Sequence, residues 1–314
     1  MQTIPLGRTG LLVGRLGLGG GGPSQLGRRA GIDENESVEI VRIALDAGVN
    51  FIDTAEAYGT EAVIGQAIRG VRRDSIYLST KKTTWGERPI TPADLRAGLE
   101  ASLKRLGTDY VDVYSLHAVG IEQYDYLCGE IVPEMQQLQT EGKIRFLGIT
   151  EAFHSDTGHA MLQRALQDEN VAWDVIMVGH NLLNQSARGR VLAQTMRKNI
   201  GVQIMFAVRL ALSRPERLRQ VVDELIEKGQ LDPAEIDRRD PLGFLLREGA
   251  AASIPDAAYR FCRDEPGAHV ILSGTGNPDH LRQNLASIAA PPLPAAVTGH
   301  LRRIFRHVDS VSGQ

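Results

Sequence analysis

The sequence predicts a (β/α)8 TIM barrel that forms a single domain over residues 1–314. Three observations support this α/β fold class. Eight short apolar segments alternate with segments of helical periodicity, these apolar segments lack the alternation of a half-exposed sheet, and the chain has the length of one barrel. An open doubly wound sheet is the main alternative, because it produces the same alternation of strands and helices.

The composition is that of an ordinary globular chain. With 314 residues, 42% hydrophobic content and a formal net charge of −3, the chain gives no reason to expect nucleic acid or a membrane surface as a partner. No apolar run approaches the roughly 18 residues of a membrane span, and the N-terminus does not have the pattern of a signal peptide. Cys128 and Cys262 lack the spacing of zinc ligands. We therefore expect a cytoplasmic protein without a metal site.

The strands follow one another in order from a small N-terminal hairpin. Residues 2–12 predict this hairpin around a Gly-Arg-Thr-Gly turn. The first barrel strand, residues 15–18, ends in four glycines at 19–22, which let a ligand or another backbone come close; a flexible loop is the alternative. The other strands are expected at residues 49–54, 76–80, 110–116, 146–150, 175–179, 202–206 and 268–272.

Helical periodicity and capping residues predict a helix after each strand. Ser37 is the expected N-cap of the first helix, and Thr91-Pro92 begins the third. One connection is unusually long, because residues 207–254 after the seventh strand carry their own helix at 215–228; such a loop is usually a lid or a binding loop. The remaining helices are expected near residues 38–45, 60–69, 91–107, 131–141, 156–166, 187–198, 256–263 and 278–288.

Three ionisable residues stand at the ends of consecutive strands. Asp53 closes the second strand, Lys81 the third and His117 the fourth, and Tyr58 follows Asp53 in the same loop. The carboxyl ends of barrel strands form the rim at which active sites lie. Each residue alone could be structural, as a turn cap, a solvated lysine or a core histidine. Together at one rim, they predict a catalytic group.

The chemistry of a tyrosine connects the four residues. A phenol has a reference pKa near 10, so it needs a nearby cation to donate a proton near pH 7. Asp53 would hold Lys81, and Lys81 would lower the pKa of Tyr58; strand alternation sends Lys81 and Lys82 in opposite directions, so only one of them can meet the tyrosine. Tyr58 would then protonate a substrate oxygen that His117 orients. A carbonyl that gains this proton also needs a hydride, which only a nicotinamide cofactor can supply.

These residues lie in motifs that resemble those of the aldo-keto reductases. The matching segments are residues 6–10, 50–55 with 58–59, 79–81, 106–112 with His117, and 142–145. The resemblance implies a (β/α)8 barrel whose N-terminal hairpin closes the bottom, a cofactor that extends across the rim, and a catalytic tetrad of Asp53, Tyr58, Lys81 and His117. It also implies an oxidoreductase that converts an aldehyde or ketone to an alcohol, or the reverse.

The second half of the chain departs from the family pattern around the nicotinamide. Thr150 and Glu151 stand where the family has Ser-Asn, and Met177 stands where it has a glutamine. An ionised glutamate can only accept hydrogen bonds, so Glu151 would favour the positively charged oxidised ring. Alternatively, Glu151 points away and ties down the loop through Phe153, and Thr150 alone makes the contact.

The segment after the seventh strand also differs from the family. The aromatic residue that stacks on the nicotinamide in the family falls near Ala207, so Phe206 would substitute from the adjacent position or the stacking is lost. Arg209 is new, and it would bind the cofactor pyrophosphate or pair with an acid of the long loop. The cofactor contacts carried over from this segment are Phe206, Val208, Arg209 and Leu210.

The loop before the last barrel helix resembles the adenosine-binding loop of the family, and a helix start suits a phosphate. Gly274 and His280 replace the lysine and arginine that some members use for the 2′-phosphate. The family favours NADP(H), and NAD(H) is a serious alternative for this chain. The contacts implied here are Ser273, Gly274, Thr275, Asn277, His280, Gln283 and Asn284, together with Gly19 on the first strand.

The sequence does not name the substrate beyond a small carbonyl compound or alcohol. Trp85, Tyr124, Tyr126 and Phe153 lie in loops at the expected rim and could line a substrate pocket, or they could pack within the loops. Two other functions are considered. One is a non-catalytic regulatory protein that binds the cofactor on the same barrel, and the other is an isomerase or aldolase that uses Lys81 as a Schiff-base amine.

Overall fold

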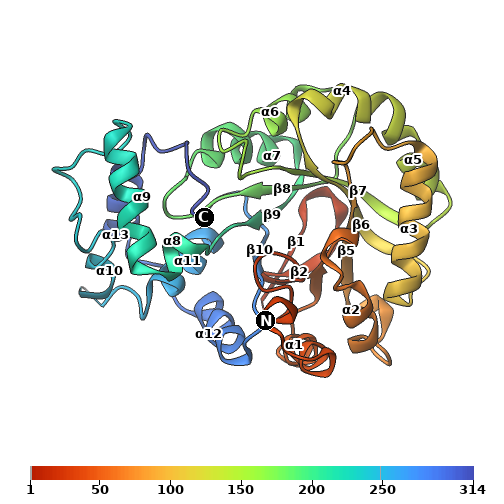
Figure 1. Ribbon diagram of the computed structural model, residues 1–314, viewed down its shortest axis with the longest axis horizontal. Coiled ribbons are helices and arrows are strands. Elements are labelled where there is room, and N and C mark those ends of the chain that lie inside the picture. The colour runs from red at the N-terminus through yellow and green to blue at the C-terminus, as the bar shows by residue number, and fades with distance from the viewer. Residues whose placement is uncertain (1, 248) are drawn as a thin grey trace.

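The computed structural model describes residues 2–247 and 249–314, and a closed barrel of eight parallel strands lies at its centre (Figure 1). Consecutive strands are neighbours, and β10 closes the barrel by pairing with both β9 and β3. The predicted barrel is thus confirmed, and the open sheet is wrong. The barrel strands are β3 (Leu16–Gly19), β4 (Phe51–Asp53), β5 (Tyr77–Thr83), β6 (Val111–Val119), β7 (Ile144–Glu151), β8 (Val175–Gly179), β9 (Gly201–Met205) and β10 (Val270–Ser273).

The N-terminal hairpin closes the bottom of the barrel, as expected. Strands β1 (Thr3–Pro5) and β2 (Leu12–Gly14) pair antiparallel. Leu6, Leu11 and Val13 are buried against apolar side chains at the lower ends of the barrel strands, including Phe51 and Val270. The hairpin therefore fills the lower end of the barrel with apolar side chains, and the opposite rim is the end at which barrel active sites lie.

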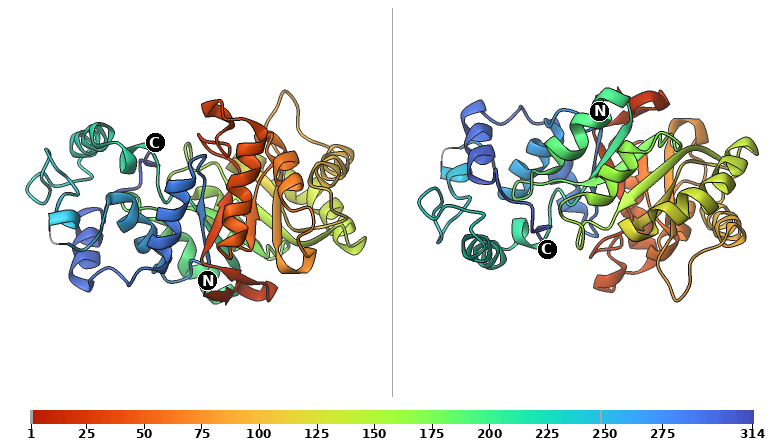
Figure 2. Two further views of the ribbon diagram at one scale, coloured as in Figure 1. Left: turned by 90° about the horizontal axis from the view of Figure 1, so that it is seen from below. Right: turned by 90° about the horizontal axis from the view of Figure 1, so that it is seen from above.

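Helices surround the barrel, as the two further views show (Figure 2). Most lie where the periodicity predicts them. The helices that accompany the strands are α1 (Glu34–Asp46), α2 (Glu61–Ala67), α3 (Pro92–Leu106), α4 (Tyr124–Tyr126) with α5 (Val132–Thr140), α6 (Ala160–Gln167), α7 (Ala193–Lys198), α11 (Ile254–Arg263) and α12 (Pro278–Ala289).

The start of α1 corrects one expectation. The N-cap is Asp33 rather than Ser37, because the Asp33 carboxylate accepts from the Glu36 amide and the Glu36 carboxylate accepts from the Asp33 amide. This reciprocal capping box satisfies two backbone donors at once. Ser37 lies inside the first turn, where its hydroxyl donates to the Asp33 carbonyl at 3.1 Å.

The long connection after β9 forms a lobe beside the barrel (Figures 1 and 2). It carries α8 (Leu210–Ser213), α9 (Pro215–Glu227) and α10 (Phe244–Arg247), and α13 (Ala295–Ile304), which the sequence did not predict, packs in the same lobe. The last residues return to the barrel rim, where Asn181 donates to the Ser312 carbonyl at 3.1 Å and the Ala211 amide donates to the Gly313 carbonyl at 3.0 Å. None of the helices described is both long enough and apolar enough to pass through a membrane.

Candidate active site

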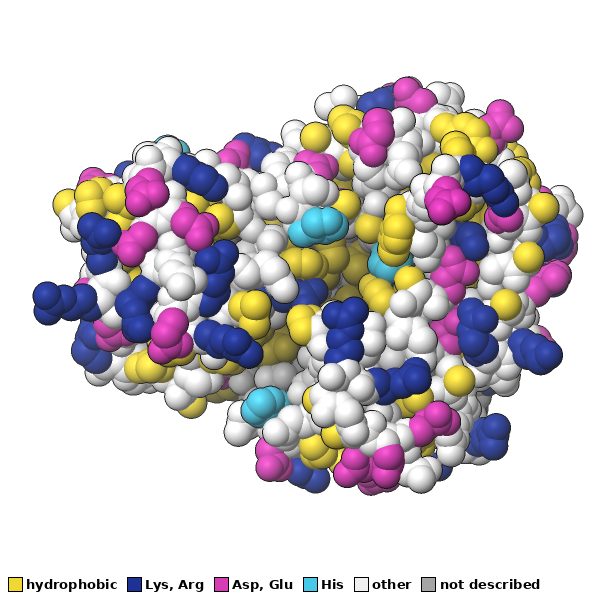
Figure 3. Space-filling view, in the orientation of Figure 1, with side chains coloured by type: hydrophobic (Ala, Val, Ile, Leu, Met, Phe, Trp, Pro, Cys, Tyr) yellow, Lys and Arg dark blue, Asp and Glu magenta, His cyan; other side chains and the backbone are white. Residues whose placement is uncertain are grey.

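A cavity of about 650 Å³ opens at the carboxyl ends of the strands, between the barrel and the lobe (Figure 3). Tyr58 and His117 lie at one end of its lining, and Thr275 and Asn284 lie in the β10–α12 region of its wall. Other parts of the wall come from the glycine-rich loop after β3, the loops after β7 and β9, and the helix α11. The cavity therefore joins the predicted catalytic residues to the predicted adenosine loop.

Lys81 and Asp53 form a buried ion pair beneath the cavity. The Lys81 ammonium donates to Asp53 Oδ2 and to the Thr54 carbonyl, each at 2.6 Å. The Asp53 carboxylate also accepts from the Ser79 hydroxyl at 2.9 Å. Burial raises the pKa of Asp53, and the Lys81 charge opposes this rise. Lys82 faces the other way and pairs with Glu56, so the register of β5 directs Lys81 inward.

Tyr58 and His117 meet above this ion pair. The Tyr58 hydroxyl lies 2.9 Å from His117 Nε2, and the Lys81 ammonium lies 5.2 Å from the centroid of the Tyr58 ring. A short turn, Glu56–Tyr58, presents the phenol, and Gly59 ends that turn with a left-handed φ of 70°. The structure thus brings the four residues of the predicted tetrad into one cluster.

The electrostatics of the cluster differ from the sequence expectation in one respect. Burial raises the pKa of the Tyr58 phenol more than the Lys81 charge lowers it, so the net direction is upward rather than downward. The burial of this ring was not visible in the sequence. Burial and the Lys81 charge lower the pKa of His117 to about 3, so its imidazole is neutral near pH 7. The free site therefore holds a protonated phenol beside a neutral imidazole.

The Glu151 carboxylate is occupied by protein groups. Its oxygens lie 2.9 and 3.0 Å from His159 Nδ1, and one of them accepts from the Gly179 amide at 2.8 Å. His159 is fully buried and its second nitrogen lies 3.0 Å from the Ser186 hydroxyl. Phe153 stacks on the His159 ring. This geometry favours the alternative in which Glu151 ties down the loop, although Glu151 still borders the cavity.

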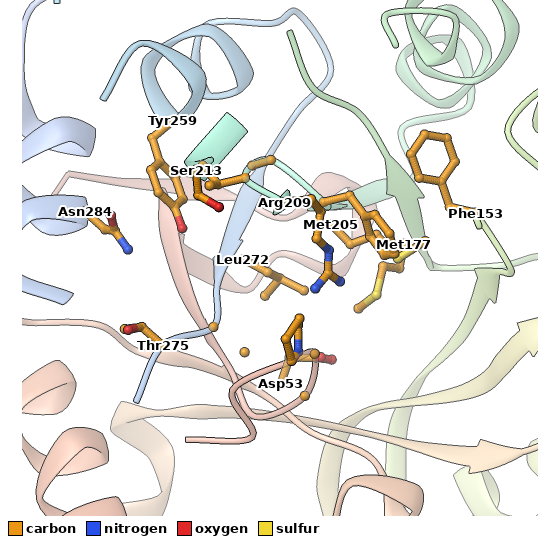
Figure 4. A pocket seen from close by; sticks show the side chains of 18 of the residues that line it. Asp53, Phe153, Met177, Met205, Arg209, Ser213, Tyr259, Leu272, Thr275 and Asn284 are labelled. Carbon is orange, nitrogen blue, oxygen red and sulfur yellow. The ribbon is translucent and has the colours of Figure 1, made fainter. Parts of the chain in front are cut away.

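Thr150, Met177 and Phe206 also border the expected nicotinamide position, and they offer the cavity few free polar groups. The Thr150 hydroxyl accepts from the Ala118 amide at 2.7 Å, and Met177 is apolar. Phe206 lines the cavity with an unusual φ of 64°, and the Arg209 guanidinium lies 3.8 Å from the centroid of its ring (Figure 4). Among the described residues no acid of the long loop pairs with Arg209. Val208 also lines the cavity, whereas Leu210 begins α8 outside the lining.

The predicted adenosine-end residues divide into two groups. Ser273 and Asn277 do not line the cavity; Ser273 accepts from Tyr259 and Asn284, and Asn277 caps α12 by accepting from the Asp279 amide. Gly19 comes so close that a Cβ on Gly274 would lie 3.2 Å from its carbonyl. The residues that line the cavity are Gly19, Gly274, Thr275, His280, Gln283 and Asn284.

Two of the four aromatic residues expected at the rim, Tyr124 and Tyr126, do not line the cavity. Tyr124 is buried away from the cavity, because its hydroxyl donates to Asp168 at 3.1 Å and accepts from the Trp173 indole at 3.3 Å. The Tyr126 hydroxyl donates to the Ile90 carbonyl, and this residue does not line the cavity either. Trp85 and Phe153 do line it, and the Trp85 ring meets His117 edge-on at 4.9 Å.

Several lining residues were missed by the sequence reasoning. Ala118 and His154 directly follow predicted site residues, so a wider window around the strand ends would have found them. Tyr259 of α11 had no comparable signal, because only the packing of α11 against the rim brings it to the cavity. The other missed residues include Pro23, Ala152, Met205, Ser213, Ser253, Pro255, Asp256, Leu272 and Ser287. No cluster of potential metal ligands occurs within the part of the chain that the structure describes.

The closed barrel with Asp53, Tyr58, Lys81 and His117 together at its rim is the arrangement that the sequence resemblance implied. The chain belongs to the aldo/keto reductase family, whose family model matches residues 15–305. It is therefore an aldo-keto reductase-type oxidoreductase that depends on a nicotinamide cofactor.

Particular relatives extend over most of the chain. The NADH-specific methylglyoxal reductase of Escherichia coli is 27% identical over 318 residues, covering 92% of this chain and 94% of that protein. An aldo-keto reductase from Klebsiella pneumoniae in complex with NADPH has a TM-score of 0.70 at 25% identity, covering 97% and 95%. The holo form of aldo-keto reductase AKR11C1 from Bacillus halodurans has a TM-score of 0.72 at 24% identity, covering 99% and 98%, which shows the shared fold.

Proposed function

We propose that this chain reduces an aldehyde or ketone to the alcohol, or catalyses the reverse oxidation, with Tyr58 as the acid. The observation that carries this proposal is the 2.9 Å contact between the Tyr58 hydroxyl and His117 Nε2 in the wall of the cavity. A carbonyl oxygen placed beside both groups would meet a proton donor and a neutral imidazole. The buried Lys81–Asp53 pair supports this arrangement from below.

The residues present fit a dinucleotide cofactor. The cavity extends from the predicted catalytic residues to the β10–α12 loop, and Gly19 and Gly274 line it with backbone alone. Phe206 and Met177 would border the nicotinamide, and Gln283 with Asn284 would border the adenosine. The cofactor, when bound, supplies the hydride that the carbonyl carbon needs.

The protein groups would control the proton. Burial keeps Tyr58 protonated until negative charge develops on the carbonyl oxygen. The phenol then gives up its proton, and the Lys81 ammonium, held by Asp53, stabilises the phenolate that remains. His117 stays neutral because the pKa of its imidazole is about 3, so it orients the oxygen by a hydrogen bond rather than as a cation.

For the cofactor we favour NADP(H), with NAD(H) as the alternative. The Klebsiella pneumoniae structure contains NADPH, whereas the Escherichia coli relative is NADH-specific. Gly274 and His280 offer no side chain with a permanent positive charge to a 2′-phosphate. Both cysteines are free thiols, which agrees with the reducing cytoplasm that we propose as the location.

A second candidate function is a regulatory protein that binds the cofactor without turnover. The observation that favours it is the occupied Glu151 carboxylate, because neither of its oxygens replaces the amide that the family offers to the nicotinamide. The Schiff-base alternative has less support, because the Lys81 amine is fully buried and already paired.

The test compares Tyr58→Phe with the control Tyr126→Phe, whose phenol lies outside the cavity. Calorimetric titration with NADPH and NADH measures binding, and reduction of 4-nitrobenzaldehyde measures turnover. We expect Tyr58→Phe to lose at least about a hundredfold in turnover, the usual contribution of a general acid, with little change in cofactor affinity. Near-normal turnover by Tyr58→Phe would refute the assignment, and binding without turnover by the unmodified chain would favour regulation.

A further inference from the structure

One cationic side chain of the cavity has no counter-charge among the described residues. Three acids line the cavity, and each has its own basic partner: Asp53 with Lys81, Glu151 with His159, and Asp256 with Arg260. Arg209 lines the same cavity, and none of the ion pairs or side-chain hydrogen bonds formed by residues 2–247 and 249–314 includes its guanidinium. An unpaired cation in a largely buried position is costly unless a ligand supplies the opposite charge.

The Arg209 guanidinium is held in a fixed orientation. Its Cζ lies 3.8 Å from the centroid of the Phe206 ring, so the flat group stacks on the ring face. A stacked guanidinium directs its N–H groups sideways rather than into the ring. Its Nε is buried and has no hydrogen-bond partner within the described chain. In Figure 4 the guanidinium points into the cavity, toward the side on which Asp53 lies.

Two adjacent glycines place Arg209 beside the proposed acid. A Cβ on Gly21 would lie 2.4 Å from Tyr58 Cε2, and a Cβ on Gly22 would lie 2.9 Å from Arg209 Nη1. Neighbouring Cα atoms are about 3.8 Å apart. The phenol and the guanidinium therefore flank the same short stretch of backbone, at the end of the cavity where the carbonyl would react.

From this juxtaposition we infer that Arg209 binds a carboxylate of the substrate, and that the chain reduces oxo acids, meaning aldehydes or ketones that also carry a carboxylate. This inference rests on the proposed function. The guanidinium fork matches the two oxygens of a carboxylate, and the resulting pair of charge-assisted hydrogen bonds would fix the carbonyl relative to Tyr58. The cofactor pyrophosphate is a second source of the same charge, but the position of the guanidinium beside Tyr58, across Gly21 and Gly22, favours the substrate.

The test uses two pairs of probes that differ in one charge. The pairs are 4-carboxybenzaldehyde with its methyl ester, and phenylglyoxylate with its methyl ester, and each is reduced under the same cofactor. The measured quantity is kcat/KM of the acid divided by kcat/KM of the ester. We expect this ratio to fall at least about tenfold in Arg209→Met, mainly through the KM of the acid. Arg214→Met, at an exposed arginine of the same connection, is the matched control and should keep the ratio of the unmodified chain.

The variant Arg209→Lys keeps the charge but loses the fork, so it should give an intermediate ratio of acid to ester kcat/KM. It replaces Arg209→Met as the test variant if Arg209→Met does not fold. An equal ratio in the unmodified chain and in both Arg209 variants overturns the inference, while ester turnover leaves the proposed function standing. A tenfold weaker affinity for NADPH in Arg209→Met with an unchanged ratio also overturns it, because the guanidinium would then bind the pyrophosphate. If neither acids nor esters are reduced by the unmodified chain with bound cofactor, the proposed function itself fails.

Discussion

Gly21 packs against the ring of Tyr58, the proposed acid, so the structure predicts how far a substitution at Gly21 would displace that ring. A Cβ at this residue would lie 2.4 Å from Tyr58 Cε2 and 2.5 Å from Cζ, whereas ordinary contact begins at 3.4 Å. In Gly21→Ala the hydroxyl end of the ring must therefore move by about 1 Å. The 2.9 Å contact with His117 would then exceed hydrogen-bond distance.

A displacement of about 1 Å at a catalytic group can reduce turnover by about a hundredfold, which corresponds to about 2.7 kcal/mol of activation free energy. The backbone of Gly21 does not have a positive φ, so alanine adds the methyl group without backbone strain. We expect kcat for 4-nitrobenzaldehyde to fall by roughly this factor, while the free energy of unfolding in urea changes by less than about 1 kcal/mol.

The matched control is Gly189→Ala, where a Cβ meets no atom within 4 Å and the backbone φ is also not positive. This variant should keep the turnover of the unmodified chain. If Gly21→Ala also turns over normally, either the loop after β3 moves freely or Tyr58 is not the acid, and the reasoning from this contact is refuted.

Three further predictions concern buried ionisable side chains. Lys81→Met should abolish most turnover and lower the free energy of unfolding by about 3–5 kcal/mol, because it leaves Asp53 buried without its partner. Lys82→Met is the control and should retain turnover, and the opposite pattern would show that the inward lysine is Lys82. Glu151→Gln should lower the free energy of unfolding by about 1–3 kcal/mol and leave the ratio of the affinities for oxidised and reduced cofactor unchanged, since both carboxylate oxygens are already bonded. A shifted ratio in calorimetry would show that the charge of Glu151 acts on the nicotinamide ring. Burial lowers the pKa of His180 to about 3, below its unfolded value near 6.5, so the unfolded chain binds more protons in this window and stability falls as the pH drops below about 6.5. Urea titrations between pH 6 and 5 should show a slope about 1.4 kcal/mol per pH unit smaller in His180→Gln, and equal slopes would contradict a neutral buried imidazole.

The fold was predictable because a barrel repeats one simple pattern. Strands buried on both faces are continuous apolar runs, and parallel neighbours bring their carboxyl ends to one rim. The tetrad followed from the same rule, since Asp53, Lys81 and His117 lie at or near those ends. The helix α13 was missed because the eightfold alternation is complete without it, although Val297 and Leu301 show helical spacing.

The direction of loop side chains was not predictable. Tyr124 and Phe153 follow neighbouring strands, yet one faces α6 through Asp168 and the other faces the cavity. The pairing of Glu151 with His159 depends on a left-handed backbone at the histidine, φ 62°, which no local pattern indicates for that residue type. Such contacts depend on how whole loops pack against one another, and residues of several rim loops together determine that packing.

The position of Trp85 allows the intrinsic tryptophan fluorescence of the protein to report on the cavity. The chain has two tryptophans: Trp85 is 49% exposed at the cavity beside His117, and Trp173 is 2% exposed in the core. Emission from the exposed indole should be red-shifted and accessible to acrylamide, while emission from the buried indole should be blue-shifted and shielded. In one unlabelled sample, the first component then follows events at the mouth of the cavity, and the second follows global unfolding.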